Sequence, residues 1–185
     1  MDIEINRLWE SAKVSKKKLS FAKKENINFH PAPLPEYKGV SVYNFGILNN
    51  EKTWGTTAHI MEDEFDTGDI IKYNKFDILK NTETAYTLRE KSRKYLLNLL
   101  SLVIDDIINS VSLSKKKQNK VGNYYSKKML NDARIITNFD NEETIQRKIR
   151  AFWCPPYSGA AIYINGKEYT IIDNKILKTL NQEGK

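Results

Sequence analysis

The sequence contains a single cysteine and no long apolar run, which excludes several classes of protein. One thiol, that of Cys154, forms neither an intrachain disulfide nor a cysteine cluster for zinc. Its neighbours Trp153 and Pro155 favour a packed, structural thiol. No apolar stretch approaches the roughly 18–20 residues of a transmembrane helix, and the N-terminus lacks the apolar region of a signal peptide. The sequence therefore predicts a cytoplasmic protein with no membrane partner.

The composition is that of a folded protein with an excess of basic residues. Of the 185 residues, 40% are hydrophobic and 29% are charged, which is usual for a globular chain and unusual for a disordered one. The net charge of +7 permits binding to nucleic acid or to phosphorylated ligands. The lysines gather in two short runs, 16–18 and 115–117, which favours solvated surfaces and linkers over a nucleic-acid partner.

Apolar patterns and loop-forming residues predict alternating strands and helices through residue 113. Thr82 is a candidate N-cap for a long helix, with Glu83 in its first turn. The apolar stripe of that helix consists of Leu96, Leu100, Val103 and Ile107. Before the helix, the expected elements are strand 26–30, a proline-rich loop, helix 40–48, strand 53–61, an acidic loop and strand 70–78.

A polar linker, 114–120, precedes a smaller C-terminal module, 121–185. The module is expected to contain a helix at 142–152, with Ile145, Ile149 and Phe152 on one face. A β-hairpin follows, in which a turn at Asn165-Gly166 joins strands 160–164 and 169–172. The chain is thus expected to divide into a polar segment with weak helical spacing at 1–25, a main part at 26–113, the linker and an α+β appendage.

Three polar residues stand out as candidates for chemistry. Asn28 and His30 are two apart on a strand, so their side chains share a face, and the end of a strand in an open α/β sheet faces the ligand crevice. The Asn28–His30 pair alone is weak evidence for a catalytic site, because a histidine at a strand end is more often structural. The same holds for His59, which shares a strand face with Thr57 and Met61.

The acidic loop EDEFDTGD presents Asp66 next to a glycine-containing turn. By itself, Asp66 is best interpreted as a carboxylate that caps the turn. The number of acids in the loop raises the question of calcium, but the spacing does not match an EF-hand, and a strand rather than a helix follows. The sequence therefore predicts no metal site here.

Taken together, three motifs resemble the folate-dependent formyltransferase family. This family includes methionyl-tRNA formyltransferase, glycinamide ribonucleotide formyltransferase and the amino-sugar N-formyltransferases. The resemblance runs from Leu19 to about Val111, and the tail IRAFWCPPYSGAAIYINGKEYTII is similar to the C-terminal extension of the sugar-modifying members. The matching positions are Asn28, His30, Leu34, Pro35 and Gly39, then Gly55, Thr57 and His59, then Asp66 and Gly68.

The resemblance implies a co-substrate, 10-formyltetrahydrofolate, and roles for the matching residues without a metal. Asn28 would donate a hydrogen bond to the oxyanion, and His30 would transfer a proton or act as a second donor. Asp66 would hold a water or the imidazole and take up the proton of the amine. Pro35, Gly39 and His59 would serve the substrate side or the structure. The pterin would lie against Glu62, Asp63, Glu64, Phe65, Thr67, Gly68 and Asp69.

The family normally begins with a nucleotide-fold half, and nothing before Asn26 resembles it. The expected fold is therefore α/β, the C-terminal half of a Rossmann-like formyltransferase sheet domain with a small α+β appendage, in which residues 1–25 are a remnant helix of the other half. The expected function is formyl transfer to a primary amine, most simply that of a nucleotide-linked amino sugar. The alternatives are a methionyl-tRNA formyltransferase-like enzyme and a truncated, weakly active remnant or subunit. The expected partners are a second copy or a complementing N-terminal half.

Overall fold

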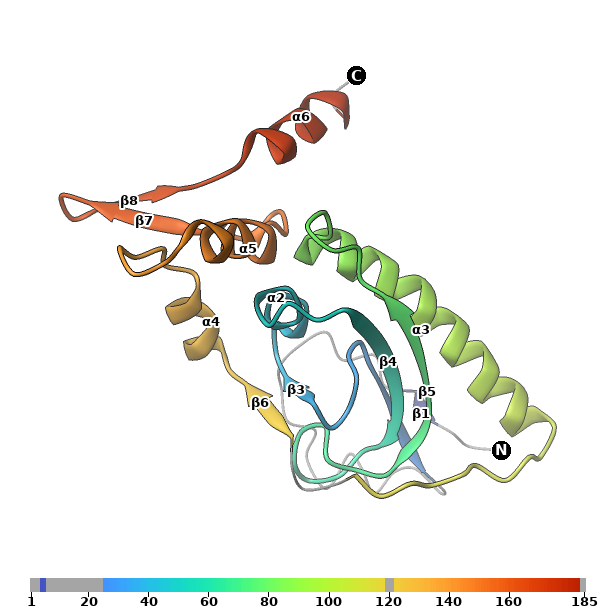
Figure 1. The fold of residues 1–185 in the computed structure, drawn as a ribbon. Helices are drawn as coiled ribbons and strands as arrows, with labels where there is room; N and C mark the ends of the chain where they lie inside the picture. Colours follow the sequence, from blue (N-terminus) through green and yellow to red (C-terminus); the bar gives the residue numbers. More distant parts are fainter. Residues whose placement is uncertain (1–3, 6–24, 119–121, 184–185) are drawn as a thin grey trace.

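The computed structural model describes residues 4–5, 25–118 and 122–183, and places an open sheet beside a long helix (Figure 1). The α/β class is confirmed, and the strands and helix expected between residues 26 and 78 all form. In chain order the elements are β1 (Glu4–Ile5), β2 (Asn26–His30), β3 (Tyr37–Gly39), α2 (Val42–Leu48), β4 (Thr53–Ile60), β5 (Ile70–Asp77), α3 (Ala85–Ile108), β6 (Asn123–Tyr125), α4 (Lys127–Ala133), α5 (Glu142–Phe152), β7 (Ala161–Ile164), β8 (Lys167–Thr170) and α6 (Asn174–Glu183).

The main sheet has the strand order β1-β2-β4-β5. β1 is parallel to β2, whereas β2, β4 and β5 pair in antiparallel fashion. In this register Asn28 lies opposite His59, and His30 lies opposite Thr57. Residues directly opposite on antiparallel strands bring their side chains together. The sheet therefore joins the first and second sequence motifs.

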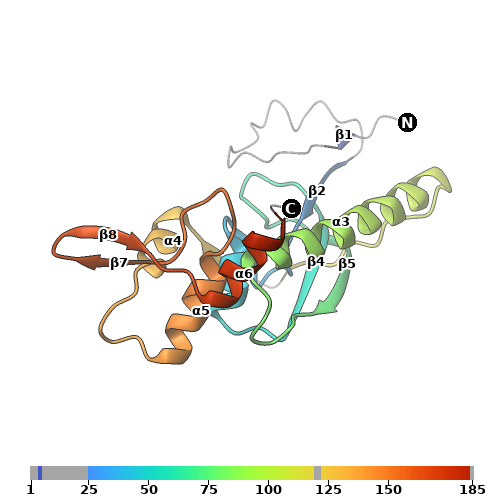
Figure 2. The same ribbon diagram turned by 90° about the horizontal axis from the view of Figure 1, so that it is seen from above.

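Helix α3 runs along one face of this sheet (Figures 1 and 2). Its Leu99 and Val103 pack with Ile27, Ala58 and Ile71 from the strands. Of the predicted apolar stripe, Val103 is buried, whereas Leu96, Leu100 and Ile107 are half-buried. The buried positions of α3 are Ala85, Leu88, Ser92, Leu99 and Val103.

The N-cap of α3 is Thr84, so the prediction of Thr82 was wrong. The Thr84 hydroxyl accepts a hydrogen bond from Thr87 N–H, and the Thr87 hydroxyl accepts one from Thr84 N–H, which completes a reciprocal capping box. Thr82 instead lies in the preceding turn. Glu83 lies just before the cap, where its carboxylate accepts hydrogen bonds from Leu79 N–H and the Thr87 hydroxyl.

The C-terminal module shares its core with the rest of the protein. β6 pairs in parallel with β3, and Tyr125 of β6 stacks on Phe45 of α2. Ile149 and Phe152 of α5 belong to the same buried cluster as Phe45 and Trp54. The boundary near residue 120 therefore divides the sequence but not the core.

Helix α5 confirms the prediction for residues 142–152, and β7 and β8 confirm the hairpin, although its second strand begins earlier, at Lys167. The sequence did not predict β1, β3, β6, α4 or α6. Cys154 is buried, and burial raises the pKa of its thiol, in agreement with a structural role. The remnant helix expected at 1–25 falls almost entirely outside the described residues. No helix in the described part of the chain is long and apolar enough to cross a membrane.

Candidate active site

The structure brings together the three residues of the expected reaction centre and adds a fourth. Asn28 and His30 come from β2, His59 from β4, and Asp66 from the loop between β4 and β5. Asp66 Oδ1 lies 3.4 Å from His30 Nδ1 and 3.6 Å from His59 Nε2. The Asn28 amide nitrogen lies 3.1 Å from His59 Nε2. His30 and His59 are only 5% and 2% exposed, so these contacts are shielded from bulk water.

Backbone carbonyls fix which nitrogen of each histidine carries hydrogen. His30 Nε2 lies 2.7 Å from the carbonyl oxygen of Tyr37, and His59 Nδ1 lies 2.7 Å from that of Ile60. A carbonyl oxygen only accepts hydrogen bonds, so both of these nitrogens must donate. In the neutral rings, the lone pairs are then on His30 Nδ1 and His59 Nε2. Both of these nitrogens lie on the side of Asp66 Oδ1.

Asp66 is held both at its carboxylate and at its backbone. Gly39 N–H donates to Asp66 Oδ2 at 2.8 Å. The amide of Gln118 donates to the carbonyl oxygens of Asp66 and Gly68, at 3.0 and 2.7 Å. Gln118 belongs to the expected linker, and nothing in its polar surroundings in the sequence indicated this role. A Cβ at Gly68 would lie 2.0 Å from the carbonyl oxygen of Ile60, so the loop requires glycine there.

Gly39 and Pro35, which the family pattern marked, support the site through the backbone. Gly39 has φ of +90°, and a Cβ there would lie 2.3 Å from the carbonyl oxygen of Tyr125. Pro35 packs just as closely against Gly122, where a Cβ would lie 2.0 Å from the carbonyl oxygen of Pro35. These two positions therefore seat the proline-rich loop against the segment around β6, which places the Gly39 N–H beside Asp66.

Burial and charge set the protonation of the central pair. Burial raises the pKa of Asp66, but the charge of His30, the contact with His59 when that ring is protonated, and the hydrogen bond from Gly39 lower it more, to about 2. Burial lowers the pKa of His30 below its usual value and outweighs the opposing attraction of Asp66. At neutral pH the pair is therefore an ionised carboxylate beside a neutral imidazole, which can accept a proton.

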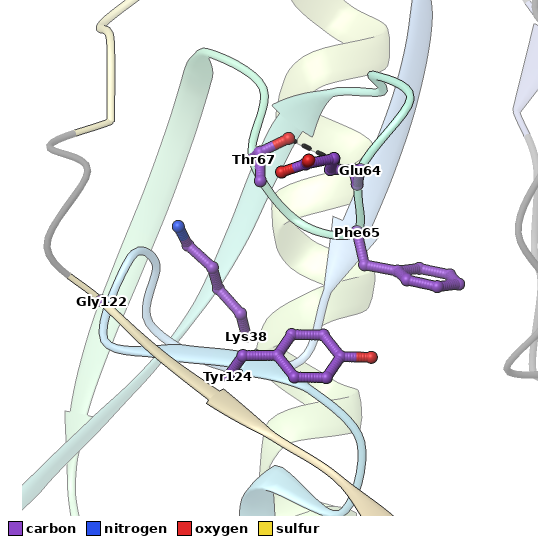
Figure 3. A pocket seen from close by; sticks show the side chains of 6 residues that line it. All are labelled: Lys38, Glu64, Phe65, Thr67, Gly122 and Tyr124. Carbon is purple, nitrogen blue, oxygen red and sulfur yellow. Dashed lines mark hydrogen bonds between the residues drawn. The ribbon is translucent and has the colours of Figure 1, made fainter.

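The loop after β4 also lines an open pocket of about 340 Å³ (Figure 3). Of the residues expected to bind the cofactor, Glu64, Phe65 and Thr67 line it, whereas Glu62, Asp63, Gly68 and Asp69 do not. The other lining residues, which the sequence did not indicate, are Lys38, Gly122 and Tyr124. Figure 3 shows the rings of Phe65 and Tyr124 projecting to the same side. Among the described residues, no group of three His, Cys, Asp or Glu side chains is arranged to hold a metal ion.

Comparison with known proteins identifies the family of this segment. A family model described as formyl transferase matches residues 14–104, the stretch that carries all four polar residues of the site. Residues 14–104 therefore match the formyl transferase family, and the resemblance inferred from the motifs is confirmed.

Curated relatives come from two branches of the family. The chain is 29% identical over 164 residues to GDP-perosamine N-formyltransferase of Brucella melitensis, an alignment that covers 88% of this chain and 61% of the relative. It is 33% identical over 160 residues to methionyl-tRNA formyltransferase of Nitratiruptor sp., which covers 86% and 50% of the two chains. The chain thus spans less than two thirds of the length of these relatives.

Solved structures confirm the fold as part of a formyltransferase sheet domain. A 4-N formyltransferase from Francisella tularensis matches with a TM-score of 0.75 and 26% identity, over 90% of this chain and 66% of that one. An N-formyltransferase from Helicobacter canadensis, solved in complex with folinic acid and dTDP-3-aminofucose, matches with a TM-score of 0.67 and 33% identity. That alignment covers 76% of this chain and 51% of the other.

Proposed function

We propose that the chain transfers a formyl group from 10-formyltetrahydrofolate to the primary amine of a nucleotide-linked amino sugar. The observation that carries the proposal is the contact of the Asp66 carboxylate with His30, beside the Asn28 amide, in a segment of the formyl transferase family. The relatives support the choice of substrates, because they include a GDP-perosamine N-formyltransferase and a structure holding folinic acid with an amino-sugar nucleotide.

The residues match what formyl transfer requires. The acceptor amine forms a bond to the formyl carbon while the bond from that carbon to the folate nitrogen breaks, and negative charge develops on the formyl oxygen. An N–H of Asn28 donates to that oxygen. The amine loses a proton, which the lone pair of His30 Nδ1 accepts beside the Asp66 carboxylate. A proton returned to the folate nitrogen completes the exchange without a metal.

We further propose that the pocket beside the Asp66 loop receives the folate. Phe65 and Tyr124 are 38% and 50% exposed, so their rings are available to a flat heterocycle. Lys38 supplies a cationic group on the same pocket wall. A Tyr124→Ala variant should bind folinic acid about tenfold more weakly, because a lost aromatic contact is worth roughly 0.5–1.5 kcal/mol beyond its buried area. Tyr163→Ala is the matched control, since Tyr163 is exposed to a similar extent, 56%, but lies on the β7–β8 hairpin and does not line the pocket.

An uncovered apolar strip on α3 supports a complementing nucleotide-fold half. Leu97 and Ile108 are 66% and 67% exposed and lie on one side of the helix. The other side of α3 is over β5, where Tyr95 stacks on Phe76 and Asp106 pairs with Lys72. The strip therefore lies on the side of α3 opposite its buried residues, turned away from the sheet. We propose that a nucleotide-fold half, elsewhere in the same polypeptide or on another chain, covers it, and that a second copy docks through the C-terminal module.

A direct assay tests the proposed function. The full chain, alone and together with the nucleotide-fold half of the Brucella relative, is incubated with 10-formyltetrahydrofolate and GDP-perosamine, and the formylated product is measured by mass spectrometry. We expect product in the complemented reaction, and a rate lowered by about 10²–10⁴-fold in the Asp66→Asn variant. Product formed from initiator methionyl-tRNA but from no amino sugar would favour the alternative function.

A further inference from the structure

His59 is placed to control the orientation of the Asn28 side chain. The two residues are directly opposite in the antiparallel register of β2 and β4, and the Asn28 amide nitrogen lies 3.1 Å from His59 Nε2. His59 is 2% exposed, so water does not compete for this contact. Its other ring nitrogen is held at 2.7 Å by the carbonyl of the next residue, Ile60.

This arrangement leaves the neutral His59 ring only one way to meet Asn28. Because Nδ1 must donate to the Ile60 carbonyl, Nε2 carries a lone pair and can only accept. An acceptor at Nε2 requires the NH₂ group of Asn28, and not its oxygen, to point toward His59. One N–H of Asn28 is then used by His59, and the second N–H remains available on the same nitrogen.

We propose that His59 is a positioning residue for Asn28. The Ile60 carbonyl fixes the tautomer of His59. Because of this tautomer, Asn28 presents a hydrogen-bond donor, rather than an acceptor, to the reacting formyl group. The catalytic role of this donor rests on the proposed function, but the tautomer of His59 and the orientation of the Asn28 amide do not. With hydrogen on Nε2 instead, His59 would attract the amide oxygen, and Asn28 would turn over. A carbonyl oxygen would then come close to the developing negative charge, where a donor is needed.

Nuclear magnetic resonance of the full chain tests the orientation without any catalysis. The protein has two histidines, His30 and His59, so a long-range ¹⁵N–¹H spectrum contains two ring patterns, and a His59→Gln variant assigns them. We expect His59 to carry its hydrogen on Nδ1 and His30 to carry its hydrogen on Nε2. A spectrum with hydrogen on Nε2 of His59 at neutral pH would overturn the proposal, whether or not the chain is an enzyme.

A double-mutant cycle tests the link to Asn28 in the complemented formyl-transfer assay. His59→Met removes the acceptor at similar volume and should lower kcat about 10²-fold, the usual loss of one oxyanion donor, with little change in the KM for folate. His59→Gln, whose side-chain oxygen can accept from Asn28, should restore most of kcat. In an Asn28→Ala background, His59→Met should have almost no further effect, because its role acts through Asn28.

A matched control separates positioning from general packing. Thr56 is buried on the same strand, but its hydroxyl bonds to Asn74 and not to the site. Thr56→Val should have the same small effect on kcat with or without Asn28. A His59→Met effect that is equally large in both backgrounds would contradict the proposal. Where turnover is too slow to measure, the side-chain amide resonances of Asn28 test whether His59 orients the amide. They should shift in His59→Met and stay unchanged in Thr56→Val.

Discussion

His30 Nδ1 and Asp66 Oδ1 face each other at 3.4 Å, although one residue ends strand β2 and the other belongs to the loop after β4. The Tyr37 carbonyl holds the far side of the imidazole, and the Gly39 N–H holds the other carboxylate oxygen. Both supports come from strand β3. The pair is therefore preorganised by one short segment, which leaves His30 Nδ1 unprotonated and ready to accept a proton beside a negative charge.

Removal of the imidazole should slow formyl transfer without unfolding the protein. In a complemented enzyme, we expect His30→Ala to lower kcat by about 10²–10⁴-fold, the usual contribution of a general acid or base. Circular dichroism would show that the variant remains folded. Near-wild-type turnover by this variant would mean that His30 is not the proton acceptor.

The pKa of His30 predicts how stability depends on pH. Because folding lowers this pKa from its usual value of 6.5, the unfolded chain binds more protons than the folded chain just below that value. The stabilisation is fully present above about pH 6.5 and is lost as pH falls toward the lowered pKa. Urea unfolding at about pH 5 and about pH 7.5 should show this loss in the wild type, and a smaller loss in His30→Gln. Equal losses in the two proteins would assign the effect to other groups.

Two glycines with positive φ provide a test of the loop that supports Asp66. Gly39→Ala would place Cβ 2.3 Å from the carbonyl oxygen of Tyr125, and should lower the free energy of unfolding by about 3 kcal/mol or more. Gly166→Ala is the control, since it has φ of +77° but meets no atom within 4 Å. It should cost only about 1–2 kcal/mol, the strain of the left-handed conformation. Thermal or urea unfolding of both variants measures the difference, and equal costs would show that the close approach of β3 and β6 is unimportant.

The C-terminal part should not recognise initiator tRNA. Its aromatic residues divide between core and surface, since Phe152 is buried and Tyr157 is 71% exposed. This composition suits packing, stacking on a nucleotide base, or contact with a second copy. In filter-binding assays at physiological salt, initiator and elongator tRNA should bind equally weakly, by charge alone. Tight binding confined to the initiator would favour methionyl-tRNA as the acceptor.

Local patterns allowed the sequence to predict most of the fold and the site. The strand alternation of β2, β4 and β5 and the amphipathic pattern of α5 are local signals, and these elements form as expected. β3 and β6 have three residues each and pair across a long stretch of chain, so neither carries a pattern of its own. The i, i+2 spacing placed Asn28 and His30 on one face. The contact of His59 with Asn28 depends on the strand register, which spacing within one strand does not reveal.

The most direct test of the central claim compares wild-type and Asp66→Asn proteins in single-turnover formyl transfer. Asparagine keeps an oxygen that can accept from the Gly39 N–H but removes the negative charge beside His30. The reaction uses the chain with and without a nucleotide-fold half, 10-formyltetrahydrofolate and an amino-sugar nucleotide. We predict slow transfer by the chain alone, because positioning by the other half is worth roughly 7–11 kcal/mol. Complementation should make transfer fast. In the complemented reaction, Asp66→Asn should lower the rate by about 10²–10⁴-fold. Transfer by Asp66→Asn at the wild-type rate would contradict the assignment of this cluster as the reaction centre.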